Sequence, residues 1–201
     1  ALLSIISRLL KAEIIGEGFP KKGTPQGGIL SPLLSNIVLN ELDWWVSNQW
    51  ESLETRKLYK TYNGRYNALK QSNLKYCYIV RYADDFKILC RTRSQAIKMF
   101  YAVKDFLQTR LHLQISEEKS KVVNLKKNSS EFLGFRLKAH RKKTNKRTLY
   151  VARSHMTKKA LKNAQIKGKQ AIKAIQKHQS VENVWRFNSV IMGIQNYYSA
   201  A

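Results

Sequence analysis

The stretch KYCYIVRYADDFKILCR, at residues 75–91, decides the fold of this chain. Aromatic and β-branched residues, which favour β-strands, stand on both sides of an Ala-Asp-Asp centre. Two such runs around a short break predict two antiparallel strands joined by a tight turn. Asp84 and Asp85 should therefore lie at the turn, with Tyr82 and Ala83 directly before them.

The adjacent carboxylates of Asp84 and Asp85 need a physical explanation, because like charges at close range repel each other unless a cation neutralises both. Mg²⁺ is a suitable cation, since one or two protein carboxylates usually hold it while substrate phosphates and water complete its octahedron. In two-metal phosphoryl transfer, such a site activates an attacking hydroxyl and stabilises the leaving oxygen. For the pair taken alone, a solvated Asp-Asp turn is the alternative interpretation.

Upstream of the acidic pair, the segment KKGTPQGGILSPLLSN occupies residues 21–36. Ser31 followed by Pro32 predicts a helix start, with Ser31 as the N-cap and proline at the first helical position. Apolar residues then recur on one face, at Leu34, Ile37, Val38, Leu42 and Trp45. We expect a long helix from about Pro32 to Trp45 that buries this face.

The segments around the acidic pair alternate between polar and apolar patterns. Residues 50–75 lose the helical period around an Asn63-Gly64 turn signal, which predicts a polar insertion or a surface hairpin. Ser94 should cap a second amphipathic helix that carries Ile97, Phe100, Val103 and Leu107. Short strands are then expected at residues 111–116, 121–125 and 131–137.

The charge of the chain points to a polyanionic partner. The 201 residues include 37 Lys and Arg against 13 Asp and Glu, which gives a formal net charge of +24. Such a surface attracts nucleic acid, although charge alone also permits an anionic membrane surface. No apolar run can span a bilayer and no secretory signal is evident, so we expect no membrane segment and a bacterial cytoplasmic or organelle-matrix location. Cys77 and Cys90 lack zinc spacing and are assigned no chemistry.

The basic residues are concentrated toward the C-terminus. Between Glu131 and Glu182 the chain contains no acidic residue. We place a domain boundary near Ala152, because two helical stripes of apolar residues follow it. The absence of acidic interruptions favours binding to phosphates over a merely solvated face.

Four short segments occur in a fixed order along the chain. GTPQGGILSPLLSN (residues 23–36) is followed by YADD (82–85), EFLGFRL (131–137) and SVIMGIQNYY (189–198). YADD matches the Tyr-x-Asp-Asp signature of reverse transcriptases. The other three segments resemble the palm-helix, primer-grip and maturase segments of group II intron reverse transcriptases. The chain therefore resembles a group II intron-type reverse transcriptase over nearly its whole length.

This resemblance implies an α/β fold, a truncated right-hand polymerase palm with helices packed on a small antiparallel sheet, followed by a basic helical thumb. Together with the composition, it places the palm portion at residues 1–151, with the polar insertion at 50–75. The thumb, or start of the maturase region, then occupies residues 152–201. The implied activity is RNA-directed DNA synthesis with two Mg²⁺ ions, deoxynucleoside triphosphates, a DNA primer and an RNA template. The resemblance also implies assistance to splicing of the intron RNA.

The resemblance assigns roles to particular residues. Asp84 would be the main metal ligand of this chain and Asp85 would support it. Lys119 would act near the triphosphate. Contacts with nucleotide and template would come from Pro25, Gln26, Gly27, Gly28, Tyr82 and Ala83. The primer grip would be Phe132, Leu133, Gly134 and Phe135, and RNA would be bound by Lys142, Lys143, Arg147, Lys158, Lys159 and Lys162.

The family pattern also requires a further aspartate on an early palm strand, before the PQGG segment. Neither Asp43 nor Asp105 lies on a predicted strand before Gly23, so we expect the missing ligand outside this chain and no polymerase activity from the chain alone. Two alternatives stay open: an RNA-binding maturase without polymerase activity, and a retron, CRISPR-associated or diversity-generating reverse transcriptase. The sequence does not indicate the oligomeric state.

Overall fold

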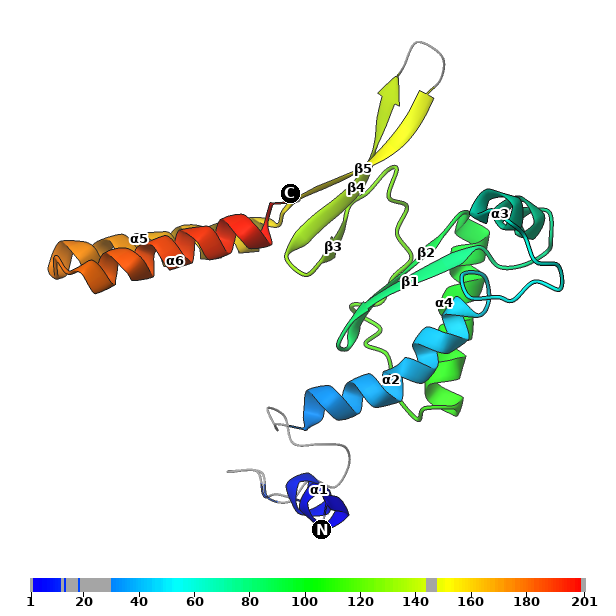
Figure 1. Cartoon of the computed structure of the whole chain (residues 1–201), viewed down its shortest axis with the longest axis horizontal. Coiled ribbons are helices and arrows are strands. Elements are labelled where there is room, and N and C mark those ends of the chain that lie inside the picture. Colours follow the sequence, from blue (N-terminus) through cyan, green and yellow to red (C-terminus); the bar gives the residue numbers. More distant parts are fainter. Residues whose placement is uncertain (1, 12, 14–17, 19–29, 144–147, 200–201) are drawn as a thin grey trace. The chain divides into compact units, whose positions relative to one another are not determined.

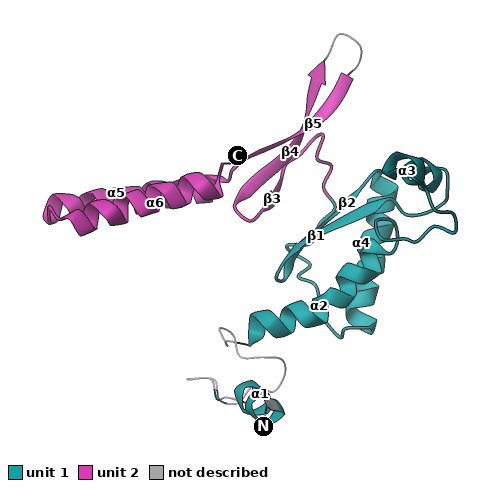
Figure 2. Cartoon of the chain, in the orientation of Figure 1, with its two compact units in different colours: residues 1–122 teal, residues 123–201 magenta. Residues whose placement is uncertain are grey.

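The chain forms two compact units, residues 1–122 and residues 123–201, which Figure 2 colours separately. The computed structural model describes residues 2–11, 13, 18, 30–143 and 148–199. The division lies earlier than the boundary near Ala152 that composition predicts. Ala152 lies inside a strand and pairs with Ala139, so the hairpin that contains both residues belongs to the second unit.

The first unit is a two-stranded antiparallel sheet backed by helices (Figure 1). Its elements are α1 (Leu2–Leu10), α2 (Ser31–Ser47), α3 (Tyr62–Lys70), β1 (Cys77–Tyr82), β2 (Asp85–Cys90) and α4 (Arg93–Thr109). Helix α2 contacts β1, and α4 contacts both β2 and α2. The core between them consists of Leu39, Leu42, Val46, Trp50, Leu69, Cys77, Met99, Val103 and Leu107.

Helix α2 confirms the predicted element but not its cap or its buried face. The N-cap is Leu30, which makes no side-chain cap hydrogen bond, and Ser31 is the first helical residue. Leu42 is buried as expected, whereas Ile37 and Val38 are 60% and 41% exposed. The buried stripe is instead Leu39, Leu42 and Val46, because this side of the helix packs against β1 and α4.

Helix α3 replaces the surface hairpin predicted around Asn63-Gly64. Thr61 caps the helix, and its hydroxyl accepts a hydrogen bond from the N–H of Gly64 at 3.2 Å. A threonine N-cap satisfies a backbone donor that otherwise has no partner, which favours helix over turn here. Leu69 joins the core, and the ring of Tyr66 lies 6.0 Å from that of Trp50. The insertion is thus anchored by apolar contacts.

The strands around the acidic pair form as predicted. β1 and β2 pair from Cys77–Cys90 to Tyr82–Asp85. Burial raises the pKa of the Cys77 thiol to about 11, so this cysteine is protonated at neutral pH.

The segments after the hairpin differ from the prediction in two ways. Helix α4 is capped by Thr92 rather than Ser94. Within the described chain, no strand forms at residues 111–116 or 121–125.

The second unit combines a three-stranded antiparallel sheet with a helical hairpin. Its elements are β3 (Ser130–Phe132), β4 (Phe135–Lys143), β5 (Thr148–Met156), α5 (Lys158–Lys177) and α6 (Val181–Tyr197). The strand order is β3-β4-β5, and α5 packs against α6. Thr157 and Ser180 cap the two helices. The strand predicted at residues 131–137 is therefore a hairpin, with Leu133 and Gly134 at its turn.

Candidate active site and nucleic-acid interface

The acidic pair lies at the exposed end of the β1–β2 hairpin. Tyr82 and Asp85 are the last paired residues, so Ala83 and Asp84 form the turn itself. Asp84, Asp85 and Tyr82 are all exposed, and Tyr82 retains 66% of its surface. Ala83 has φ of 52°, in the left-handed region, which costs a non-glycine residue roughly 1–2 kcal/mol. Both carboxylates are thus accessible, on a turn with a strained backbone.

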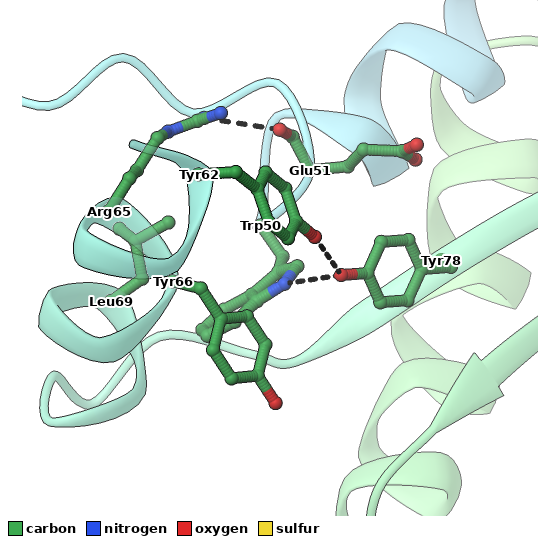
Figure 3. Close-up of a pocket in the computed structure, with 7 residues that line it drawn as sticks. All are labelled: Trp50, Glu51, Tyr62, Arg65, Tyr66, Leu69 and Tyr78. Atoms are coloured by element: carbon green, nitrogen blue, oxygen red, sulfur yellow. Dashed lines mark hydrogen bonds between the residues drawn. The ribbon is translucent and has the colours of Figure 1, made fainter. Parts of the chain in front are cut away.

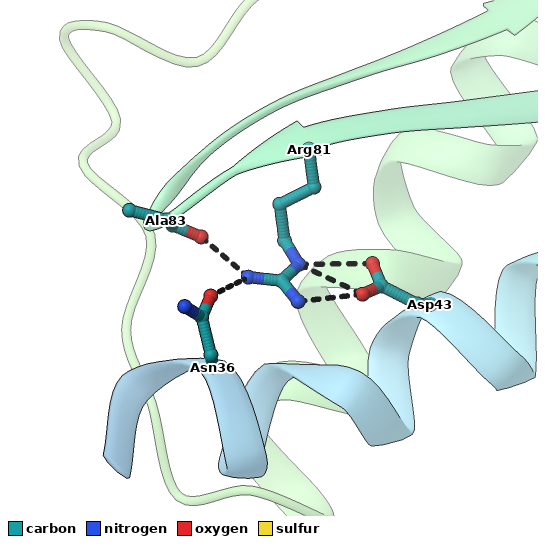
Figure 4. A network of polar contacts seen from close by, with 4 residues as sticks. All are labelled: Asn36, Asp43, Arg81 and Ala83. Carbon is teal, nitrogen blue, oxygen red and sulfur yellow. Dashed lines mark hydrogen bonds and ion pairs between the residues drawn. The ribbon is translucent and has the colours of Figure 1, made fainter. Parts of the chain in front are cut away.

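A partly buried arginine next to this turn was missed by the sequence analysis. The guanidinium of Arg81 donates to the carboxylate of Asp43, from Nε at 2.9 Å to each oxygen and from Nη2 at 2.6 Å to Oδ2 (Figure 4). Its Nη1 donates to Oδ1 of Asn36 at 2.8 Å and to the carbonyl of Ala83 at 2.7 Å. The hydrogen bonds to Asp43 raise the pKa of the Arg81 guanidinium. The sequence analysis names Asp43, but no local pattern connects it with Arg81.

The two carboxylates fit Mg²⁺ as a partial site. A hard, oxygen-seeking cation is commonly held by one or two carboxylates plus substrate phosphates. Asp43 is engaged by Arg81, and Asp105 lies on α4. Among the residues that the structure describes, no three His, Cys, Asp or Glu side chains gather into a metal-binding group. The exposed carboxylates of Asp84 and Asp85 thus suit a cation whose other ligands come from water and substrate phosphates.

The other residues predicted to contact nucleotide are placed only in part. Pro25, Gln26, Gly27 and Gly28 lie outside the described residues. Lys119 is exposed in a turn after α4, where its backbone N–H donates to the carbonyl of Ser116 at 3.2 Å.

A small cavity in the first unit lies away from the acidic turn. It measures about 90 Å³ and is lined by Trp50, Glu51, Tyr62, Arg65, Tyr66, Leu69 and Tyr78 (Figure 3). The indole N–H of Trp50 donates to the hydroxyl of Tyr78 at 3.2 Å, and the Tyr62 and Tyr78 hydroxyls lie 3.4 Å apart. Tyr78 pairs with Leu89, four residues along β1 from the turn. We assign this cavity to the packing of α3 against β1.

The predicted primer-grip residues form the β3–β4 turn of the second unit. Gly134 has φ of 79°, and a Cβ there would lie 2.8 Å from the hydroxyl of Tyr198. The ring of Phe135 lies 5.6 Å from that of Tyr197 and 5.1 Å from that of Tyr198. The Tyr197 hydroxyl donates to the carbonyl of Leu133 at 3.0 Å. The turn is therefore pinned to the C-terminal end of α6, and it requires glycine.

The predicted RNA-binding lysines are exposed. Lys142 and Lys143 lie at the end of β4, while Lys158, Lys159 and Lys162 lie in the first two turns of α5. Arg147 lies outside the described residues. The first turn of α5 contains no acidic residue, so the lysines add to the positive end of the helix dipole. This end of α5 is strongly electropositive.

An exposed pair of carboxylates on a hairpin turn, with helices behind the sheet, is the arrangement of a polymerase palm. Residues 3–137 match the reverse transcriptase (RNA-dependent DNA polymerase) family, and the chain belongs to this family. The family assignment carries the palm fold with it. No helix in the described part of the chain is long and apolar enough to cross a membrane.

Among curated proteins, the chain is 29% identical to the group II intron-encoded protein LtrA of Lactococcus lactis, over 89% of this chain and 40% of LtrA. It is 32% identical to protein YkfC of Escherichia coli, over 67% of this chain and 38% of YkfC. It is also 26% identical to the COX1/OXI3 intron 2 protein of Saccharomyces cerevisiae, over 58% of this chain and 17% of that protein. The chain thus spans about two-fifths of the length of LtrA and of YkfC, and a smaller share of the yeast protein. The predicted resemblance to group II intron reverse transcriptases is confirmed.

Proposed function

We propose that this chain carries part of the active site of an RNA-directed DNA polymerase of the group II intron type. The polymerase would extend a DNA primer along an RNA template with deoxynucleoside triphosphates. The observation that carries the proposal is the exposed Asp84-Asp85 turn between β1 and β2, in a chain of the reverse transcriptase family. Without a bound cation, two adjacent carboxylates would repel each other and would also repel the phosphates of a bound RNA.

Asp84 is the main magnesium ligand in this proposal, and Asp85 supports it. Two bound Mg²⁺ ions would lower the pKa of the primer hydroxyl and neutralise charge on the triphosphate. Tyr82 and Ala83 face the primer end, and residues 25–28 approach template and nucleotide. Lys119 stands near the leaving pyrophosphate. The family pattern includes a further aspartate, and we propose that it comes from polypeptide upstream of this chain.

The second unit supplies the nucleic-acid interface in this proposal. Phe132 to Phe135 grip the primer, and α5 and α6 form the thumb at the start of a maturase region. The exposed lysines 142, 143, 158, 159 and 162, together with Arg147, contact phosphates of intron RNA or of the primer–template duplex. The polymerase would also assist splicing of its intron, as an RNA-binding activity independent of the carboxylates.

The test is Asp84→Asn in the complete polymerase. Asparagine keeps the shape of the turn but removes the charge that holds magnesium, so primer extension should fall by about a thousandfold or more, while RNA affinity stays within about twofold. Asp85→Asn should act in the same direction. Extension rate and equilibrium RNA binding are measured at one salt concentration. If the wild type extends primers no faster than Asp84→Asn, an RNA-binding maturase without polymerase activity replaces the proposal.

A further inference from the structure

Arg81 connects the acidic turn to helix α2. It lies on β1, two residues before Ala83, and its side chain is 11% exposed. One edge of the guanidinium, Nε and Nη2, faces the carboxylate of Asp43, and Nη1 donates to Asn36 and to the Ala83 carbonyl (Figure 4). Asn36 and Asp43 both lie on α2, two turns apart. The arginine therefore joins the turn backbone to a helix of the core.

The geometry of this contact requires arginine. A planar guanidinium presents donors in several fixed directions, so one edge can take a carboxylate while another nitrogen serves a carbonyl. A lysine ammonium has a single nitrogen and cannot reach Asp43, Asn36 and Ala83 together. The Asp43 carboxylate also compensates the charge of the poorly exposed Arg81, which would otherwise be costly to bury.

The contact determines the direction of the peptide that precedes Asp84. The carbonyl of Ala83 and the N–H of Asp84 belong to one planar peptide unit. Ala83 adopts a φ of 52°, which alanine does not favour, so a contact to its carbonyl helps to hold this conformation. The hydrogen bond from Arg81 at 2.7 Å supplies it. The orientation of the Asp84 main chain is thus set from α2.

We infer that Arg81 is a positioning residue for the catalytic carboxylates, with Asp43 and Asn36 on α2 as its anchors. The inference rests on the proposed polymerase function. A carboxylate displaced by a fraction of an ångström would bind magnesium less tightly and would hold the ion away from the line between primer hydroxyl and triphosphate. Loss of the anchor should therefore lower kcat much more than it changes the KM for nucleotide.

The experiment compares four variants of the complete polymerase: Arg81→Lys, Asp43→Asn, Asn36→Ala and Arg110→Lys. The last is a matched control, because Arg110 joins α4 to Glu41 of α2 through an exposed ion pair at 3.2 Å. We expect Arg81→Lys and Asp43→Asn to lower kcat by about tenfold to a hundredfold. The magnesium concentration for half-maximal rate should rise, while the nucleotide KM and RNA affinity stay within about twofold. Arg110→Lys should match the wild type.

Thermal melting shows whether each variant is folded. If Arg81→Lys or Asp43→Asn unfolds, Asn36→Ala decides, because it removes one acceptor at an exposed position and should still lower kcat about threefold. The inference is overturned if kcat of the folded Arg81, Asp43 and Asn36 variants stays within twofold of Arg110→Lys while Asp84→Asn abolishes extension. In that case the proposed function stands. If the wild type itself does not extend primers, both ideas fail.

Discussion

The two compact units differ in the interactions that stabilise each of them. The first unit has a contiguous buried core that includes Leu42 and Val46, both fully buried. In the second unit, the buried residues among those described are Thr157 and Ala171. Large side chains such as Trp185 and Met192 of α6 are 70% and 59% exposed there. The first unit is stabilised mainly by a buried apolar core, and the second mainly by strand pairing and helix caps.

This difference shows how each unit suits the work proposed for it. Catalytic carboxylates must be held within a fraction of an ångström, so the acidic turn stands on strands and helices locked by a core. Phosphate contacts are spread over many side chains and tolerate more freedom. The second unit therefore relies on the β4–β5 ladder, on helix caps and on the aromatic cluster around Phe135.

The largest effect on stability should come from the core of the first unit. Leu42→Ala removes a fully buried side chain and leaves a cavity, so it should lower the free energy of unfolding by about 2–5 kcal/mol. Ile37→Ala on the same helix is the matched control, because Ile37 is 60% exposed and should change it by less than about 0.5 kcal/mol. Urea denaturation measures both. If both variants lost the same free energy of unfolding, the burial of Leu42 and the exposure of Ile37 would be contradicted.

The next effect concerns RNA affinity. Changing Lys142, Lys143, Lys158 and Lys162 of the second unit to glutamate should weaken binding to structured RNA by about a hundredfold and flatten its dependence on salt. The control changes four exposed lysines of the first unit by the same charge: Lys57, Lys60, Lys70 and Lys98. Binding is measured across a salt series. A larger loss in the control would move the interface to the first unit.

A smaller effect is expected at the β3–β4 turn. Gly134→Ala places a Cβ 2.8 Å from the Tyr198 hydroxyl and forces alanine into φ of 79°, which should destabilise the second unit by about 1–3 kcal/mol. Gly168→Ala on α5 is the control, since nothing lies within 4 Å of its added Cβ and alanine favours helix by about 1 kcal/mol. Proteolysis of the second unit reports both. Faster cleavage of Gly168→Ala would contradict the distinction.

The smallest effect separates stability from binding within α5. Lys159→Glu places a negative charge in a first turn that has none, which should stabilise the helix by about 0.5 kcal/mol. The same change should weaken RNA binding severalfold, because it removes a phosphate contact. Lys159→Gln is the control, with a smaller change in each direction. A variant that gains both stability and affinity would show that Lys159 does not face RNA.

The elements with a local signal could be predicted from sequence. The β1–β2 hairpin, α2 and α4 follow from alternating and helical apolar patterns, which depend on neighbours in the chain. Some errors were local, since Thr92 rather than Ser94 caps α4 and Thr61 caps α3. Two others arose where contacts with another element decided the outcome. Helix α3 forms in place of a hairpin because Leu69 and Tyr66 find partners on Trp50 and its surroundings. The stripe of α2 is rotated because β1 and α4 select which apolar residues are covered.

The candidate site divides in the same way. The Asp84-Asp85 pair, its place at a strand turn and the family resemblance follow from the sequence alone, because consecutive residues carry them. The Arg81, Asp43 and Asn36 network was visible only in the tertiary structure. Asp43 and Asn36 lie 38 and 45 positions from Arg81 in the sequence. No pattern in the sequence indicates which of many arginines contacts which carboxylate. Folding of α2 against β1 makes that choice, because it removes Arg81 from water and leaves Asp43 as the charge that compensates it.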